Sequence, residues 1–276
     1  MLSEALALLI AVALSVVGTV FKFIAWLGGS MAALVDAATC FASIVAGLVA
    51  LWAFSKSREP PDTEHLYGHE RYVVYGGILV IAIYSVVLGM VVDRLLYRVI
   101  DLEYSVSISA PIYVAIGTAI YLIAIAIARH GGLVGRTYAT FISSEVLEGV
   151  VTICASLAGS LLSSLIDYVG GWVLTTYLAY EVFHELRGYE KSLTDWSEPR
   201  LVKEIEEMFR SVGIEVKSIR LRMVVPHRYV GDAVVMVGRD YDIEKAHEVV
   251  DDVVRRIRSR LGIDITVHYE PQSSRG

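Results

Sequence analysis

Side chains able to bind a metal ion lie inside the apolar stretches of this sequence, where polar groups are costly. Asp36 and Cys40 are four residues apart within the apolar run Met31 to Phe54, so a helix would place them on one face. Glu145 lies within a second apolar run, Tyr138 to Ile166. A carboxylate and a thiolate suit a borderline metal such as zinc, whereas carboxylates alone suit harder ions such as manganese. An acid in the middle of a membrane helix costs about 2.5 to 3.5 kcal/mol, which favours a functional reason for its presence.

Two interpretations of these buried acids remain open. One is structural, either a hydrogen bond between helices or a misplaced helix end that leaves the acid in water. The other is a metal site in which protons and metal ions compete for the same carboxylates. The second interpretation is favoured, because such competition is what exchange of a metal for protons requires. Glu148 lies one turn beyond Glu145 and could join this site. Lys22, one turn from the end of the first apolar run, is expected to extend its ammonium to the membrane interface.

A second group of candidate ligands follows the apolar run that contains Asp36. It consists of Asp62, His65 and His69. Pro60 and Pro61 break the chain before this loop. The spacing lets one carboxylate and two imidazoles converge on a single ion if the loop folds back. A solvated polar loop is the alternative, and on spacing alone it is the better supported of the two.

The composition indicates a membrane protein with a soluble extension. The 276 residues are 55% hydrophobic and have a mean hydropathy of +0.57. Of the 54 charged residues, 24 lie in residues 1–190 and 30 in the remainder. We therefore expect a transmembrane domain at 1–190, a soluble domain at 191–270 and a disordered tail at 271–276. A net charge of −6 argues against nucleic acid as a partner, and the two cysteines, both in apolar runs, provide no disulfide framework.

Six apolar runs predict six transmembrane helices. They are Ala5 to Leu27, Met31 to Phe54, Tyr72 to Leu96, Ala110 to Ala128, Tyr138 to Ile166 and Gly171 to Leu186. The first run lacks the basic start and cleavage site of a signal peptide, so we expect it to be retained. Basic residues gather after the second, fourth and sixth runs, at Lys56, Arg58, Arg71, Arg129, Arg136, Arg187 and Lys191. This bias predicts that both termini and the histidine loop are cytoplasmic.

The C-terminal part of the chain has the pattern of a small soluble domain. Apolar residues at helical spacing predict helices at 201–212 and 243–257. Alternation predicts strands at 219–225 and 263–267, with a more buried strand at 233–237. The predicted fold class is thus an α-helical membrane protein with six transmembrane helices and a small α+β cytoplasmic domain of order αββαβ, two helices covering one face of its sheet.

The motifs of membrane enzymes are absent from the sequence. His184-Glu185 and His247-Glu248 each begin a zinc-protease pattern, but neither has the second histidine three residues further on. The sequence contains neither a G-x-S-x-G nucleophile motif nor a glycine-rich phosphate loop. We expect a protein that is not an enzyme.

Taken together, these features resemble the cation diffusion facilitator family of divalent metal/proton antiporters, over essentially the whole chain. The shared features are six spans, acids in the second and fifth, the loop DTEHLYGHER and the αββαβ tail. The most specific motif is H-x-[FY]-G-H, present here from His65 to His69. Ala246-His247 and the closing segment ITVHYEP, Ile265 to Pro271, are also similar to the family's tail. The resemblance implies a homodimer that exports divalent cations in exchange for protons by alternating access.

The resemblance implies a transport site with four ligand positions. Asp36 matches the first acid of the second span, and Cys40 stands where a second acid is usual. Glu145 matches the last ligand of the fifth span. Phe141, four residues earlier, has no donor atom, so three of the four positions keep a metal ligand.

Three further groups of residues follow from the resemblance. Asp62, His65 and His69 match a cytoplasmic metal site of some members. Arg71 and Asp195 match an ion pair, partly shielded from water, that joins the third span to the end of the sixth. The third group is a weak metal site at the dimer interface of the C-terminal domain, formed by His247, His268 and Glu270; its usual partner histidines are replaced by Lys217 and by Val234 or Val237.

The resulting hypothesis is a homodimeric antiporter of the cell membrane that exports a divalent cation from the cytoplasm, with protons as the counter-ion. Zinc is the favoured substrate, and cadmium, cobalt, iron and manganese are the alternatives. The alternative function is a non-transporting or metal-sensing relative that keeps the fold and has a degraded transport site.

Overall fold

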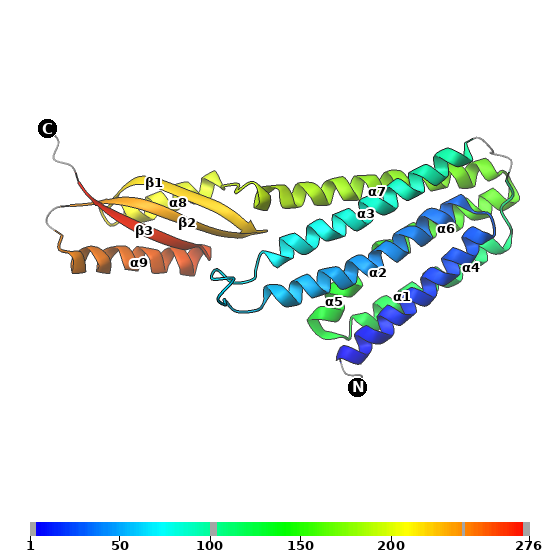
Figure 1. The fold of residues 1–276 in the computed structure, drawn as a ribbon, viewed down its shortest axis with the longest axis horizontal. Coiled ribbons are helices and arrows are strands. Elements are labelled where there is room, and N and C mark those ends of the chain that lie inside the picture. Colours follow the sequence, from blue (N-terminus) through cyan, green and yellow to red (C-terminus); the bar gives the residue numbers. More distant parts are fainter. Residues whose placement is uncertain (1–3, 100–103, 239–240, 273–276) are drawn as a thin grey trace.

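A computed structural model describes residues 4–99, 104–238 and 241–272 of the chain. The molecule is elongated, with a helical bundle at one end and a small α/β domain at the other (Figure 1). The bundle contains α1 (Glu4–Leu27), α2 (Met31–Ser57), α3 (Tyr72–Arg98), α4 (Ser109–Ala128), α5 (Gly132–Phe141), α6 (Ser144–Leu161) and α7 (Ser164–Leu193).

Five segments of the bundle are long and apolar enough to cross a membrane. They are the first four helices and the segment Gly132–Leu161, which holds α5 and α6. The 30-residue α7 packs against α3 and α6 and contains the sixth predicted span. The helical membrane architecture expected from the apolar runs is confirmed.

The fifth predicted span is not one continuous helix. α5 ends at Phe141 and α6 begins at Ser144, and the Ser143 hydroxyl donates to the Ala139 carbonyl across 2.6 Å at the break. A serine that bonds back to the preceding turn competes with the helical ladder and bends the chain. Phe141 and Glu145 therefore lie on different helices, not on one helical face.

α2 lies at the centre of the bundle, in contact with α1, α3, α6 and α7. Its N-terminus is capped by the Ser30 hydroxyl, which accepts from the Ala33 N–H. Small residues such as Ala32, Ala37 and Ala42 are fully buried along it and allow close approach of the neighbouring helices. This central position puts one face of α2 in reach of both α1 and α6.

The C-terminal domain consists of α8 (Pro199–Arg210), β1 (Glu215–Val225), β2 (Arg228–Val237), α9 (Ile243–Leu261) and β3 (Asp264–Pro271). The strand order is β1-β2-β3, with β1 antiparallel and β3 parallel to β2. Apolar side chains of both helices and all three strands form one core, including Ile205, Phe209, Val235, Val250 and Ile265. The predicted αββαβ order is confirmed.

The predicted disordered tail is partly wrong. β3 continues to Pro271, and the Gln272 N–H donates to the Val237 carbonyl across 3.0 Å. The pairing of β3 with β2 extends this far because Val237 lies opposite Pro271 in the register. The other residues of that expectation, 273–276, lie outside the described part of the chain.

Candidate metal site

Asp36 and Cys40 on α2 and Glu145 on α6 come together inside the helical bundle. Their donor atoms lie within 4.8 Å of one another, and all three side chains are buried. Cys40 lies nine residues beyond the start of α2, or about 14 Å along it, close to midway across a 30 Å hydrocarbon layer. The structure thus gathers the three residues that the sequence assigned to one site.

The contacts within this cluster are short. The Cys40 thiol donates to Glu145 Oε2 across 2.7 Å and lies 3.6 Å from Asp36 Oδ1. Asp36 Oδ2 is buried and has no hydrogen-bond partner. A buried carboxylate oxygen without a partner is costly, and a metal ion would satisfy it.

Lys22 is the largest departure from the sequence-based expectation. It does not extend to the membrane interface; its side chain is fully buried, and its Nζ lies 2.7 Å from Asp36 Oδ1. The same ammonium donates to Cys40 Sγ at 3.1 Å and to the Glu145 carbonyl at 3.2 Å. A buried ammonium keeps its charge only with such partners, so the attraction of Asp36 outweighs the pull of the interface.

A signal for the position of Lys22 was present in the sequence. Ser15, Thr19 and Lys22 are spaced by four and three residues, and all three are buried on α1. Thr19 Oγ1 is hydrogen-bonded to the Tyr121 hydroxyl of α4 at 2.8 Å. Polar residues at this spacing within an apolar helix indicate a face directed at other helices, not at lipid.

Glu148 and Phe141 do not complete the cluster. Glu148 is buried one turn beyond Glu145, and its Oε2 accepts from the Thr39 hydroxyl at 2.7 Å. Phe141 ends α5, and its ring lies near Gly47 of α2. The described cluster of mutually close donors is therefore Asp36, Cys40 and Glu145.

The loop residues Asp62, His65 and His69 also lie together, with donor atoms within 4.8 Å of one another. Asp62 Oδ1 is 3.4 Å from His65 Nδ1, and Asp62 Oδ2 is 3.4 Å from His69 Nε2. Both of these imidazole nitrogens are buried without a hydrogen-bond partner. The loop folds back, and the carboxylate and the two imidazoles therefore converge as the spacing allows.

Two local contacts prepare this loop cluster for a cation. His69 Nδ1 lies 3.1 Å from the Pro60 carbonyl, which can only accept, so in the neutral imidazole Nδ1 carries the hydrogen and the lone pair is on Nε2. The backbone N–H groups of His65 and Glu64 donate to Asp62 and lower the pKa of its carboxyl. The cluster therefore offers an ionised carboxylate and an imidazole lone pair at the same place.

A cleft of about 1450 Å³ lies between this loop and the C-terminal domain, and His65 and His69 line it. Arg71 and Asp195 face each other there at 3.6 Å, with exposed fractions of 59% and 57%. The two predicted partners are thus brought together, and within the single chain both side chains are exposed to the cleft. Their shielding at the junction of a dimer stays a prediction.

A shorter ion pair also joins the loop to the C-terminal domain. Glu70 Oε2 lies 2.7 Å from Arg228 Nε, and Arg228 Nη2 lies 3.5 Å from Asp264. This network was not expected from the sequence.

The three residues proposed for a C-terminal metal site are not gathered within this chain. Among the described residues, mutually close donors occur in the two clusters above, and His247, His268 and Glu270 are in neither. Glu270 Oε2 instead pairs with Lys217 Nζ at 2.5 Å.

Another buried acid, Asp167 on α7, was not identified from the sequence. It accepts from the Ser30 hydroxyl and the Met31 N–H, both at 2.6 Å, and lies 2.8 Å from the Tyr104 hydroxyl. Its oxygens are fully engaged at the N-terminus of α2, so this acid has a structural role.

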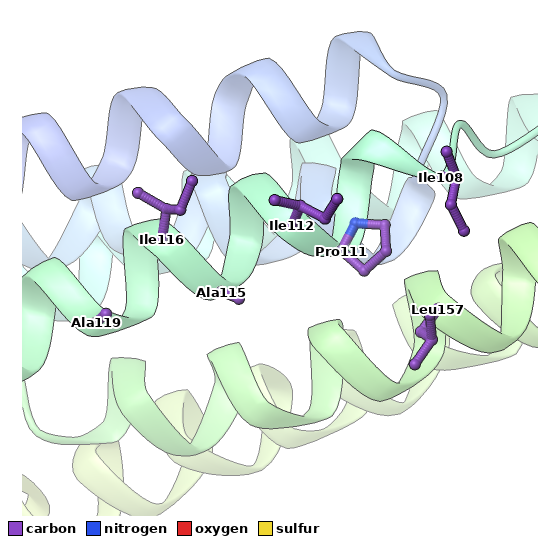
Figure 2. Close-up of a pocket in the computed structure, with 7 residues that line it drawn as sticks. All are labelled: Ile108, Pro111, Ile112, Ala115, Ile116, Ala119 and Leu157. Carbon is purple, nitrogen blue, oxygen red and sulfur yellow. The ribbon is translucent and has the colours of Figure 1, made fainter.

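The apolar groove in Figure 2 lies between α4 and α6 and has a volume of about 560 Å³. Its lining residues carry no side-chain metal donor; they include Ile108, Pro111, Ile112, Ala115, Ile116 and Leu157. The metal-binding candidates therefore lie elsewhere, in the two clusters.

Comparison with known proteins gives matches along nearly the whole chain. The cation efflux transmembrane domain matches residues 8–193, and the cytoplasmic domain of cation efflux proteins matches residues 198–272. The chain is 23% identical over 269 residues to the manganese efflux system protein MneS of Bacillus subtilis, covering 93% of this chain and 91% of that protein. It is also 23% identical over 263 residues to an uncharacterized transporter of Synechocystis, covering 88% and 82% respectively.

Proposed function

The chain belongs to the cation efflux family, and on that premise we propose that it exports a divalent metal ion in exchange for protons. The observation that carries the proposal is the buried cluster of Asp36, Cys40 and Glu145, held between α2 and α6 near the middle of the bundle. Two acids and a thiol that converge in an apolar interior are the donor set of a cation site. The role is transport, not catalysis.

Zinc is the proposed substrate, with cadmium next. A thiolate ligand favours these softer ions over manganese, which prefers oxygen donors. Manganese is the cation named for the Bacillus subtilis relative, and it is the alternative substrate here. Carboxylate and thiol ligands must lose their protons before they bind a metal, so metal binding releases protons. That coupling supports proton exchange.

We place the protein in the cell membrane as a homodimer, with both termini and the α/β domain in the cytoplasm. The excess of basic residues next to the loop cluster and after α7 supports this orientation. The match of the C-terminal domain to the cytoplasmic domain of cation efflux proteins agrees with it. The loop cluster of Asp62, His65 and His69 would then bind a second ion on the cytoplasmic side, within reach of the open cleft.

Proteoliposomes with an acidic interior test this proposal. Zinc added outside should enter while protons leave, and dissipating the pH gradient should stop the uptake. Asp36→Ala removes one ligand and should abolish transport. Cys154→Ser changes an exposed thiol outside the cluster and should leave transport unchanged. If Asp36→Ala takes up zinc as well as the parent does, Asp36 is not a ligand of the transported ion and the site assignment is wrong.

A second candidate function is a metal-sensing relative that no longer transports. The ion pair between Lys22 and Asp36 favours it, because a cation is already bound to one of the proposed ligands. The same vesicles distinguish the two functions. If no divalent cation crosses the membrane under either sign of the pH gradient, the second function replaces the first.

A further inference from the structure

The ammonium of Lys22 lies among the proposed substrate ligands. Its Nζ donates to Asp36 Oδ1 at 2.7 Å, to Cys40 Sγ at 3.1 Å and to the Glu145 carbonyl at 3.2 Å. It also lies 5.0 Å from the centre of the Tyr121 ring. Lysine and both ligand side chains it contacts are fully buried. A positive charge from α1 is thus held where a substrate cation would be bound.

Simple geometry shows that this ammonium and a metal ion cannot share the site without strong repulsion. A metal bound to Asp36 Oδ1 would lie about 2.1 Å from that oxygen. The ammonium lies 2.7 Å from the same atom. The two cations could then be at most roughly 4.8 Å apart, which in a buried, poorly screened site is strongly unfavourable.

Lys22 reaches the site through space that a glycine of α4 leaves open. Its side chain passes over Gly117 of α4, where an added Cβ would lie 3.1 Å from Lys22 Cγ and 2.7 Å from the Gly18 carbonyl. Withdrawal of the ammonium on metal binding would use the rotatable bonds of the four-carbon lysine stem. Asp36 Oδ2, which has no partner, provides a first contact for an arriving metal.

We propose that Lys22 is a tethered cation that competes with the metal substrate for Asp36 and Cys40 and thereby sets the affinity of the transport site. The inference rests on the proposed function, which assigns these residues as substrate ligands. Competition of this kind weakens the binding of every divalent ion by the same factor, so Lys22 tunes affinity and not selectivity. Return of the ammonium to Asp36 would also promote release of the metal.

The test is a Co²⁺ titration of the purified full-length protein in a Cys154→Ala background. Charge-transfer absorption between a thiolate and Co²⁺ then reports on Cys40 alone, because the loop cluster contains no thiol. Lys22→Met keeps the length of the side chain and removes its charge, and it should bind Co²⁺ at least about tenfold more tightly than the parent. Lys22→Arg keeps the charge and should not show this gain. Binding by Lys22→Met equal to or weaker than that of the parent would overturn the proposal.

Removal of the charge leaves Asp36 unpaired, so Lys22→Met could unfold in the absence of metal. Lys22→Gln, which keeps a hydrogen-bond donor, is therefore titrated as well, and both variants are also purified with Zn²⁺ present. Folding that depends on Zn²⁺ supports the proposal, because the metal then replaces the lost ammonium. Failure of both neutral variants to fold with and without Zn²⁺ would mean that Lys22 is a fixed structural ion pair, and the proposal fails.

The same variants separate this inference from the proposed function. Tighter Co²⁺ binding by Lys22→Met without vesicle transport by the parent would refute transport and leave the competition intact. If the parent transports the metal and Lys22→Met binds Co²⁺ with unchanged affinity, the competition is refuted and the proposed function stands. If Lys22→Met binds Co²⁺ and the parent binds none, the result also supports competition between Lys22 and the metal.

Discussion

The thiol of Cys40 donates a hydrogen bond to Glu145 Oε2 across 2.7 Å, joining two residues 105 positions apart in the chain. This contact ties α2 to α6 at the proposed substrate site. The thiol must give up its proton before its sulfur can bind a metal, so metal binding would replace this hydrogen bond by two ligand bonds. The same atoms would therefore serve helix packing in the metal-free state and metal binding in the loaded one.

The chemistry of this thiol leads to the first prediction. Cys40→Asp replaces a soft donor by a hard one at the same place on α2, so the ratio of manganese to zinc transport should rise. The measurement is competition between the two ions for uptake into the proteoliposomes described above. Cys154→Ser, which changes the thiol outside the cluster, serves as the control. An unchanged ratio in Cys40→Asp would show that Cys40 does not contact the transported ion.

The loop cluster leads to a second prediction. Replacing both His65 and His69 by Ala should remove one bound ion per protomer, because two of the three ligands are lost. Metal content of the purified protein, measured by elemental analysis after equilibration with zinc, checks this. His130→Ala removes an exposed imidazole elsewhere and should leave the stoichiometry unchanged. If the double variant retains the full metal content, the loop is a solvated polar turn.

The affinity of the loop site for zinc should depend on pH in a defined direction. Backbone N–H groups of His65 and Glu64 lower the pKa of the Asp62 carboxyl, so Asp62 stays ionised as the solution is acidified below neutral. Metal ligands must be free of protons to bind zinc, so the affinity should fall, and not rise, as the pH decreases. Zinc titrations of an Asp36→Ala variant at several pH values isolate this site. An affinity that rises on acidification would contradict the ligand assignment.

A fourth prediction concerns the ion pair between Arg71 and Asp195. Both side chains are more than half exposed and their closest charged atoms are 3.6 Å apart, so the coupling free energy should be below about 1 kcal/mol. A double-mutant cycle with Arg71→Glu and Asp195→Arg, read from thermal unfolding, measures it. The pair of Glu70 and Arg228, at 2.7 Å, is the comparison and should show the larger coupling. The reverse order would mean that Arg71 has a role beyond this contact.

Much of the fold could be predicted from the sequence, because burial in a membrane and in a small sheet leaves strong patterns. The starts of α2 and α3 coincide with the predicted apolar runs, since hydrophobicity changes abruptly at Ser30 and Arg71. In the C-terminal domain, alternation revealed β1 and β3 because one face of the sheet is covered by the core. The break between Phe141 and Ser144 was missed because both halves of the segment are apolar, and the hydrogen bond of the Ser143 side chain that accompanies it leaves no mark in the hydropathy.

The candidate site was predicted in part. Apolar context pointed to Asp36 and Glu145, but their proximity depends on the packing of α2 against α6, which hydropathy does not encode. Lys22 was placed at the interface because its distance from the helix end fits a residue that reaches water. Its actual partner, Asp36, lies on the next helix, and the turn at Gly28 and Gly29 brings the two face to face. Such a pairing requires knowledge of which helical faces meet.

The last prediction concerns Asp167, which binds the start of α2 from α7. Its carboxylate accepts from the Ser30 hydroxyl and the Met31 N–H, and a negative charge at a helix N-terminus is favourable. Asp167→Ala would leave both buried donors without an acceptor. The free energy of unfolding should fall by on the order of 3 kcal/mol, since each hydrogen bond to a charged group contributes about 1.5 to 3 kcal/mol.

Thermal unfolding of the purified protein measures this loss, and Asp93→Ala on α3, an exposed acid, is the matched control that should change stability little. Asp167→Asn keeps one acceptor oxygen and should lose less stability than Asp167→Ala. Because Asp167 lies outside the two candidate metal clusters, the Co²⁺ affinity of folded Asp167→Asn should equal that of the parent. A variant that folds normally but binds Co²⁺ more weakly would instead make Asp167 part of the transport pathway.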